Sequence, residues 1–115
     1  MANRVYHVEV LGRDAPRLQK YFTDLFGWKV DTNNPGGYGM WDPAETGIAG
    51  GVGAAPEGSP GHVTFYVGVP DVDAALARAQ ELGGTVIVPK FSPSPDAVLA
   101  LFADPEGHVI GLTEA

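Results

Sequence analysis

The chain has 115 residues and a mass of 12.0 kDa, which is the size of one compact domain. Hydrophobic residues make up 44% of it and charged residues 18%, so the composition is that of a globular protein and not of a disordered one. There is no cysteine, which excludes disulfide frameworks, cysteine zinc sites and iron–sulfur clusters.

The charge balance is acidic, with 14 Asp and Glu against 7 Lys and Arg and a net charge of −7. An acidic chain without any basic run repels phosphate backbones, so we expect no nucleic-acid partner. No apolar stretch approaches the length that spans a bilayer, and the N-terminus lacks the apolar run of a signal peptide. We therefore expect a cytoplasmic protein with no membrane partner.

The first half predicts a strand, a helix and three further strands. Residues 5–11 alternate in polarity as a strand does, and a helix with an apolar stripe follows. Asp14 is a favourable N-cap for this helix and Gly27 a favourable stop. Three short strands are predicted next, at residues 28–31, 38–41 and 48–52, the last two joined around Asp42-Pro43.

The second half repeats this order. A strand at residues 62–69 precedes a helix that Asp71 caps, and further strands are predicted at 85–88, 97–103 and 109–113. Residues 91–96 are predicted to be a proline-rich connection, and Asp104 to Gly107 a type I turn. The opening histidines, His7 and His62, lie 55 positions apart in equivalent strands.

The repeat predicts an α+β fold of two βαβββ modules within a single domain, residues 1–115. The modules are 4–53 and 62–115, and residues 54–61 are the linker. In each opening strand an apolar face should pack on the helix, with Val63, Phe65 and Val67 forming it in the second module. The mixed faces should line a shared cavity, which places five residues there: His7, Glu9, His62, Thr64 and Tyr66.

Several motifs resemble the vicinal oxygen chelate superfamily, which includes glyoxalase I, bleomycin-resistance proteins and extradiol dioxygenases. They are the paired βαβββ order, the histidine strands, residues 21–28, the Gly61-His62-Val63 segment and the turn at residues 104–108. The resemblance implies curved sheets around a cavity, a homodimer, and metal ligands at His7 and His62. It also implies carboxylate ligands in the last strand of each half. Gly111 stands at that position in the second half, and residues 48–52 contain no carboxylate.

The two histidines have three interpretations. In the first, they are ligands of a divalent metal such as zinc, nickel, manganese or iron, with Glu9 as a third ligand. In the second, they are hydrogen-bonding groups in a metal-free pocket. In the third, they are structural residues. Glu9 is either a general base or a carboxylate at a wet cavity mouth. Tyr66 and Trp41 either stack on a planar ligand or belong to the core.

The leading hypothesis for function is binding of a small organic molecule in the cavity, without metal. The pocket residues are then His7, His62, Thr64, Tyr66, Trp41 and Gly111, with Glu9 as the candidate catalytic group. One alternative is a metal-dependent lyase, isomerase or dioxygenase that uses His7, His62 and Glu9. Another is an accessory domain with a vestigial site.

Overall fold

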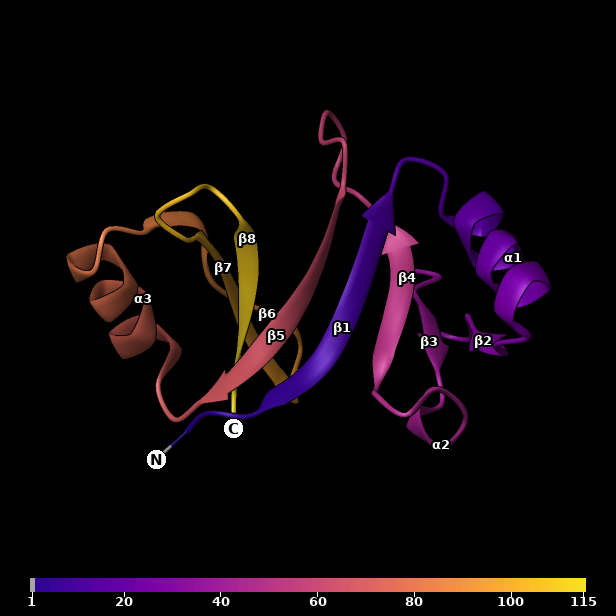
Figure 1. The fold of residues 1–115 in the computed structure, drawn as a ribbon, viewed down its shortest axis with the longest axis horizontal. Helices are drawn as coiled ribbons and strands as arrows, with labels where there is room; N and C mark the ends of the chain where they lie inside the picture. Colours follow the sequence, from indigo (N-terminus) through magenta and orange to yellow (C-terminus); the bar gives the residue numbers. More distant parts are fainter. Residues whose placement is uncertain (1) are drawn as a thin grey trace. The chain divides into compact units, whose positions relative to one another are not determined.

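The computed structural model describes residues 2–115, which divide into two compact units. The N-terminal unit is His7–Val63, and the C-terminal unit consists of residues 2–6 and 64–115. Each half of the chain has the order strand, helix and three strands, so the predicted α+β class and the repeat are confirmed (Figure 1).

The N-terminal unit is built on a four-stranded mixed sheet in the order β2-β3-β4-β1. β1 and β4 are parallel, whereas β3 is antiparallel to both β2 and β4. The elements are β1 (Val5–Gly12, in this unit from His7), α1 (Ala15–Phe26), β2 (Val30–Asp31), β3 (Gly39–Trp41), α2 (Pro43–Thr46) and β4 (Gly50–Ala54).

The C-terminal unit repeats this arrangement, with the order β5-β8-β7-β6. β5 and β8 are parallel, and β7 is antiparallel to β8 and β6. The elements are β5 (His62–Val69, in this unit from Thr64), α3 (Val72–Glu81), β6 (Thr85–Ser94), β7 (Ala97–Ala103) and β8 (Val109–Glu114). In both units the first strand therefore pairs with the last one.

Aspartate side chains begin all three helices of the described chain. Asp14, Asp42 and Asp71 each accept a hydrogen bond from a backbone N–H in the first turn, which satisfies one of the unpaired donors there. Gly27 ends α1 in the left-handed conformation, at φ 75°. The caps predicted at Asp14, Gly27 and Asp71 are confirmed.

Two elements differ from the prediction. Asp42-Pro43 does not simply join two strands, since it begins α2, a four-residue helix too short to show a hydrophobic period. Residues 91–94 are not a connection, because β6 continues through them to Ser94. β6 is the last strand in the order of its unit, and an edge strand is the place in a sheet where prolines such as Pro89 and Pro93 are tolerated.

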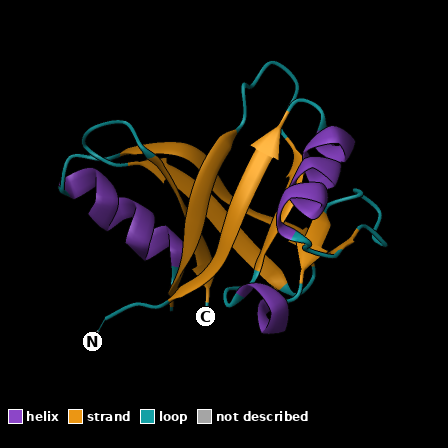
Figure 2. Ribbon diagram, turned by 45° about the vertical axis from the view of Figure 1, so that its right-hand side comes forward, coloured by secondary structure: helices purple, strands orange, loops and turns teal. Residues whose placement is uncertain are grey.

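The core of the C-terminal unit lies between α3 and the sheet (Figure 2). Its buried members are Val72, Leu76, Ala100 and Leu112. The first two come from α3 at helical spacing, and the others come from β7 and β8. This cluster packs α3 onto β7 and β8.

The predicted apolar face of β5 is only partly correct. Val67 packs against the core, but Val63 is 78% exposed and Phe65 is also exposed. The polar and aromatic residues on the other face, Thr64 and Tyr66, are buried instead. Within the C-terminal unit α3 contacts β6, β7 and β8. Likewise α1 leaves Tyr21, Leu25 and Phe26 of its stripe exposed.

Among residues 2–115, the helices are all too short or too polar to cross a membrane.

Shortening Leu76 tests the core. Leu76 is 6% exposed, so Leu76→Ala should lower the free energy of unfolding by about 2–4 kcal/mol through lost burial and a residual cavity. Leu82→Ala is the matched control, because Leu82 is 63% exposed and should cost much less. Urea titration followed by circular dichroism measures both, and equal losses would contradict this description of the core.

Candidate functional site

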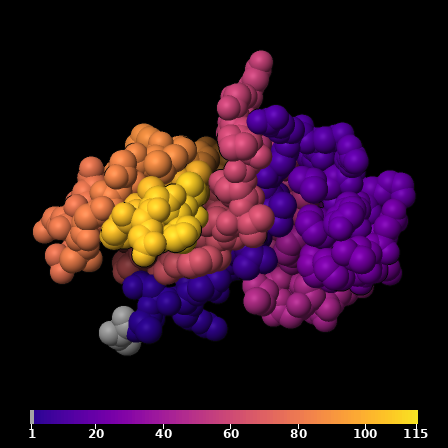
Figure 3. Space-filling view, turned by 45° about the horizontal axis from the view of Figure 1, so that its top comes forward, coloured from indigo at the N-terminus to yellow at the C-terminus, as the bar shows by residue number. Residues whose placement is uncertain are grey.

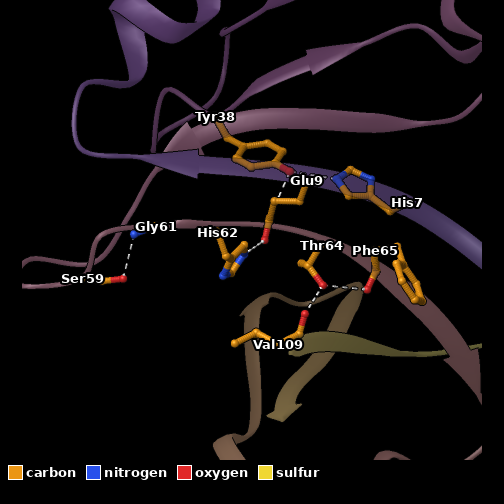
Figure 4. A network of polar contacts seen from close by, with 9 residues as sticks. All are labelled: His7, Glu9, Tyr38, Ser59, Gly61, His62, Thr64, Phe65 and Val109. Carbon is orange, nitrogen blue, oxygen red and sulfur yellow. Dashed lines mark hydrogen bonds and ion pairs between the residues drawn. The ribbon is translucent and has the colours of Figure 1, made fainter. Parts of the chain in front are cut away.

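Four side chains of the N-terminal unit form one hydrogen-bonded chain (Figure 4). His7 Nε2 lies 2.8 Å from the Tyr38 hydroxyl, and this hydroxyl lies 3.1 Å from Glu9 Oε1. The other carboxylate oxygen, Glu9 Oε2, lies 2.8 Å from His62 Nε2. Glu9 is therefore the centre of the cluster, with one imidazole at each end.

The Glu9 carboxylate is buried, at 7% exposure, and both of its oxygens are engaged. A buried carboxylate needs such hydrogen bonds, because the loss of hydration is otherwise very costly. In this hydrogen bond a carboxylate oxygen accepts and the Nε2–H of His62 donates. Glu9 thus orients the His62 ring, as a carboxylate does in other carboxylate–histidine pairs.

The hydroxyl proton of Tyr38 determines the direction of the hydrogen bond at the His7 end of the cluster. The hydroxyl donates to Glu9, so its oxygen accepts from the Nε2–H of His7. The His7 ring also stacks on the Tyr38 ring, with centroids 6.0 Å apart. Burial lowers the pKa of His7 below its usual value, and the negative charge of Glu9 opposes this only in part. His7 is therefore held as a neutral imidazole at neutral pH.

Two glycines of β4 make room for Tyr38. A Cβ at Gly51 would lie 2.2 Å from the Tyr38 ring, and one at Gly53 would lie 2.5 Å from it. Gly51 is also the partner of Glu9 in the β1–β4 ladder, so the ring lies beside the carboxylate. The Asn34 side chain fixes the backbone of Tyr38, since it accepts from the Tyr38 N–H and donates to the Tyr38 carbonyl.

Gly61 positions His62 at the start of β5. Its φ is +89°, and a Cβ there would lie 1.9 Å from the carbonyl oxygen of Leu11 in β1. The N–H of Gly61 donates to the Ser59 hydroxyl in the preceding loop, residues 55–61, which forms the pink projection in Figure 3. Only glycine combines this conformation with such a close approach, so the position of His62 depends on glycine at position 61.

The hydrogen bonds of two other predicted pocket residues go to backbone carbonyls. Thr64 is buried in the C-terminal unit, and its hydroxyl donates to the Val109 carbonyl at 2.5 Å. Trp41 is buried in the N-terminal unit, where its indole N–H donates to the Ile48 carbonyl and its ring packs on Trp28. The roles of Thr64 and Trp41 in ligand binding stay predictions.

Tyr66 and Gly111 form a close pair in the C-terminal unit. They are partners in the β5–β8 ladder, and a Cβ at Gly111 would lie 2.4 Å from the buried Tyr66 ring. The space next to Gly111, where the resemblance places a carboxylate ligand, is therefore filled by an aromatic ring. Tyr38 fills the equivalent space over Gly51 in the N-terminal unit.

The donor set does not fit a bound metal ion in this arrangement. Tyr38 lies between His7 and Glu9, and the Nε2 atoms of the two histidines face different groups. Within residues 2–115, three or more His, Cys, Asp or Glu side chains are nowhere grouped so that they could hold a metal. The metal ligation predicted for His7 and His62 stays a prediction.

Sequence reasoning brought His7, Glu9 and His62 together but missed Tyr38. The signal that could have found it is the pair of glycines at alternate positions of one strand, Gly51 and Gly53, which face the same side. They indicate that something large lies on this side of β4. They do not say which residue it is.

Comparison with known proteins identifies the family. Residues 7–113 match the model of the glyoxalase-like domain. The chain belongs to this family.

Among curated proteins, this glyoxalase-like chain is 34% identical over 115 residues to the Mycobacterium tuberculosis protein named "Putative glyoxylase CFP32". The Mycobacterium bovis protein of the same name is equally similar. The match covers 94% of this chain but 44% of the relative, so the chain spans less than half the length of these proteins.

Solved structures are similar in fold. A glyoxalase/bleomycin resistance protein/dioxygenase superfamily member from Vibrio splendidus has a TM-score of 0.64 at 21% identity, over 99% of this chain and 100% of that one. Methylmalonyl-CoA epimerase from Mycobacterium tuberculosis has a TM-score of 0.65 at 16% identity, over 96% and 86%. At these identities the likeness concerns the fold alone.

Gly51→Ala tests the space under Tyr38. The new methyl group should clash with the ring and lower the free energy of unfolding by about 1–3 kcal/mol. In a Tyr38→Ala background most of this cost should vanish, because the clashing ring is gone. Gly36→Ala is the control, since a Cβ there has no neighbour closer than 4.0 Å. A cost that is unchanged in the Tyr38→Ala background would show that the ring does not lie on Gly51.

The lowered pKa of His7 predicts a pH dependence of stability. Below about pH 6.5 the unfolded chain binds a proton at His7 more readily than the folded chain does. The free energy of unfolding should therefore fall as the pH drops from about 6.5 through the lower folded-state pKa. Urea midpoints between pH 8 and 5 measure this, and His7→Gln should flatten the slope whereas the control His108→Gln should not. An unchanged slope in His7→Gln would contradict the assignment.

Proposed function

We propose that this glyoxalase-like protein binds a small polar organic molecule at the cluster of His7, Tyr38, Glu9 and His62, without a metal ion. The observation that carries the proposal is the buried Glu9 carboxylate held between a phenol and an imidazole. Buried polar networks are costly to build, and such groups gather at functional sites more often than elsewhere.

The chemistry of the cluster supports a ligand with hydrogen-bonding oxygens or nitrogens. Glu9 engages Nε2 of the His62 ring, so Nδ1 is the ring nitrogen that this proposal assigns to the ligand. Tyr38 holds the neutral His7 ring in the same manner. In this proposal Glu9 acts mainly as the orienting group, because both of its oxygens are already engaged. As a general base it would first have to give up one partner.

A thermal-shift screen of polar metabolites and antibiotics tests this function. A ligand of the cluster should raise the melting temperature, since binding at 100 times Kd stabilises the folded state by about 2.7 kcal/mol. The rise should be lost in Glu9→Gln and His62→Gln. It should persist in His108→Gln, which removes a histidine whose ring interacts with Asp104 in an exposed turn. A ligand whose effect survives both cluster variants binds elsewhere and would refute the assignment.

A divalent-metal enzyme that uses His7, His62 and Glu9 is the competing function. The three residues lie in one cluster, which favours it, but Tyr38 would have to move out of the chain first. Metal analysis of untagged protein decides between the two. Less than about a tenth of an equivalent of zinc, nickel, manganese or iron, with no stabilisation when these ions are added, supports the metal-free pocket. Stoichiometric metal that His62→Gln abolishes supports the enzyme.

The expected homodimer and the cytoplasmic location belong to the same proposal. Sedimentation equilibrium of the purified chain tests the dimer.

An accessory domain with a vestigial site is the third candidate. It gains support when no ligand is found and a chain with both His7→Ala and His62→Ala keeps every measured property.

A further inference from the structure

A hollow lies entirely within the C-terminal unit, and none of the four residues of the histidine cluster lines it. It occupies about 720 Å³ between one side of α3 and the sheet. Its floor is apolar and comes from three strands, with Val69 of β5, Phe102 of β7 and Leu112 of β8. Hollows of roughly 300–1,000 Å³ with apolar walls are typical of small-molecule sites.

Small side chains on α3 create this hollow. Ala74, Ala75 and Ala79 face it at helical spacing, so the helix covers the apolar floor without filling the space above it. Larger residues at these positions would close the gap, as Leu76 does where α3 contacts the core. The hollow is bounded by Pro70 before α3 and by Pro105 in the turn before β8.

The charges around the hollow disfavour an anionic occupant. Asp71 and Asp104 line it, and each already accepts backbone N–H bonds at a helix cap or turn. The one cation among the lining residues is Arg78, which lies 3.8 Å from Glu81. An anion would therefore meet two carboxylates, and the remaining lining is mostly apolar, which favours a neutral molecule.

We propose that this hollow is a binding site for a neutral, apolar small molecule of about 10–20 heavy atoms, with an aromatic or aliphatic skeleton. Burial of its surface on Val69, Phe102 and Leu112 would provide the binding free energy, at about 25 cal/mol per Å² of apolar area. The site does not depend on His7, Glu9 or His62, so it stands apart from the function proposed above.

Titration with N-phenyl-1-naphthylamine, a neutral fluorescent dye, tests the site in the full chain. The folded protein should bind it saturably, and Ala75→Leu and Ala79→Leu should each raise Kd at least about tenfold by filling the hollow. Ala77→Leu is the matched control, because Ala77 is an exposed residue of the same helix and does not line the hollow. Circular dichroism and cooperative melting show whether each variant is folded. Two filling variants are used so that the test still stands when one of them does not fold.

Further measurements distinguish binding in the hollow from binding at the histidine cluster or between two copies of the chain. His62→Gln should leave dye binding unchanged, whatever happens to the ligand of the histidine cluster. The anionic dye 1-anilinonaphthalene-8-sulfonate should bind more weakly than the neutral one. The proposal is overturned when the neutral dye shows no saturable binding, when both filling variants bind like Ala77→Leu, or when the anionic dye binds more tightly. Dye binding that falls as sedimentation shows dimer formation would assign the hollow to a second copy instead.

Discussion

A single buried carboxylate organises the N-terminal unit around the candidate site. Glu9 lies inside the unit, and His62 and Tyr38 engage its two oxygens. Removing a charge from water is tolerated only when the surrounding groups replace the hydration, so the position of Glu9 dictates those of both partners. Gly61 and Gly51 then follow as the residues that let His62 and Tyr38 come close enough.

The parts of the fold that sequence reasoning predicted are those with a local physical signal. Asp14 and Gly27 bound α1 as expected, because a cap and a left-handed stop depend on a few neighbouring atoms. The equivalent positions of His7 and His62 indicated a shared role from the repeat alone. Glu9 joined them because it lies two residues from His7 on the same face of β1, a relation fixed by the period of a strand.

The parts that could not be predicted depend on contacts between distant segments. Nothing near Tyr38 in sequence announces that its hydroxyl reaches Glu9, 29 positions away. The exposure of Phe65 and the burial of Tyr66 are decided by packing and not by the pattern of polar and apolar residues within β5. β6 runs through Pro93 because it lies last in the strand order of its unit, which is a property of the whole sheet.

The Tyr66–Gly111 pair also constrains how such a chain can change over evolution. Because the ring occupies the volume that any side chain at position 111 would need, a carboxylate cannot arise there by a single substitution without displacing its neighbour. A smaller residue at position 66 would free that volume, and until it was filled the unit would carry a void. The identities of the residues at positions 66 and 111 are therefore coupled through one shared volume.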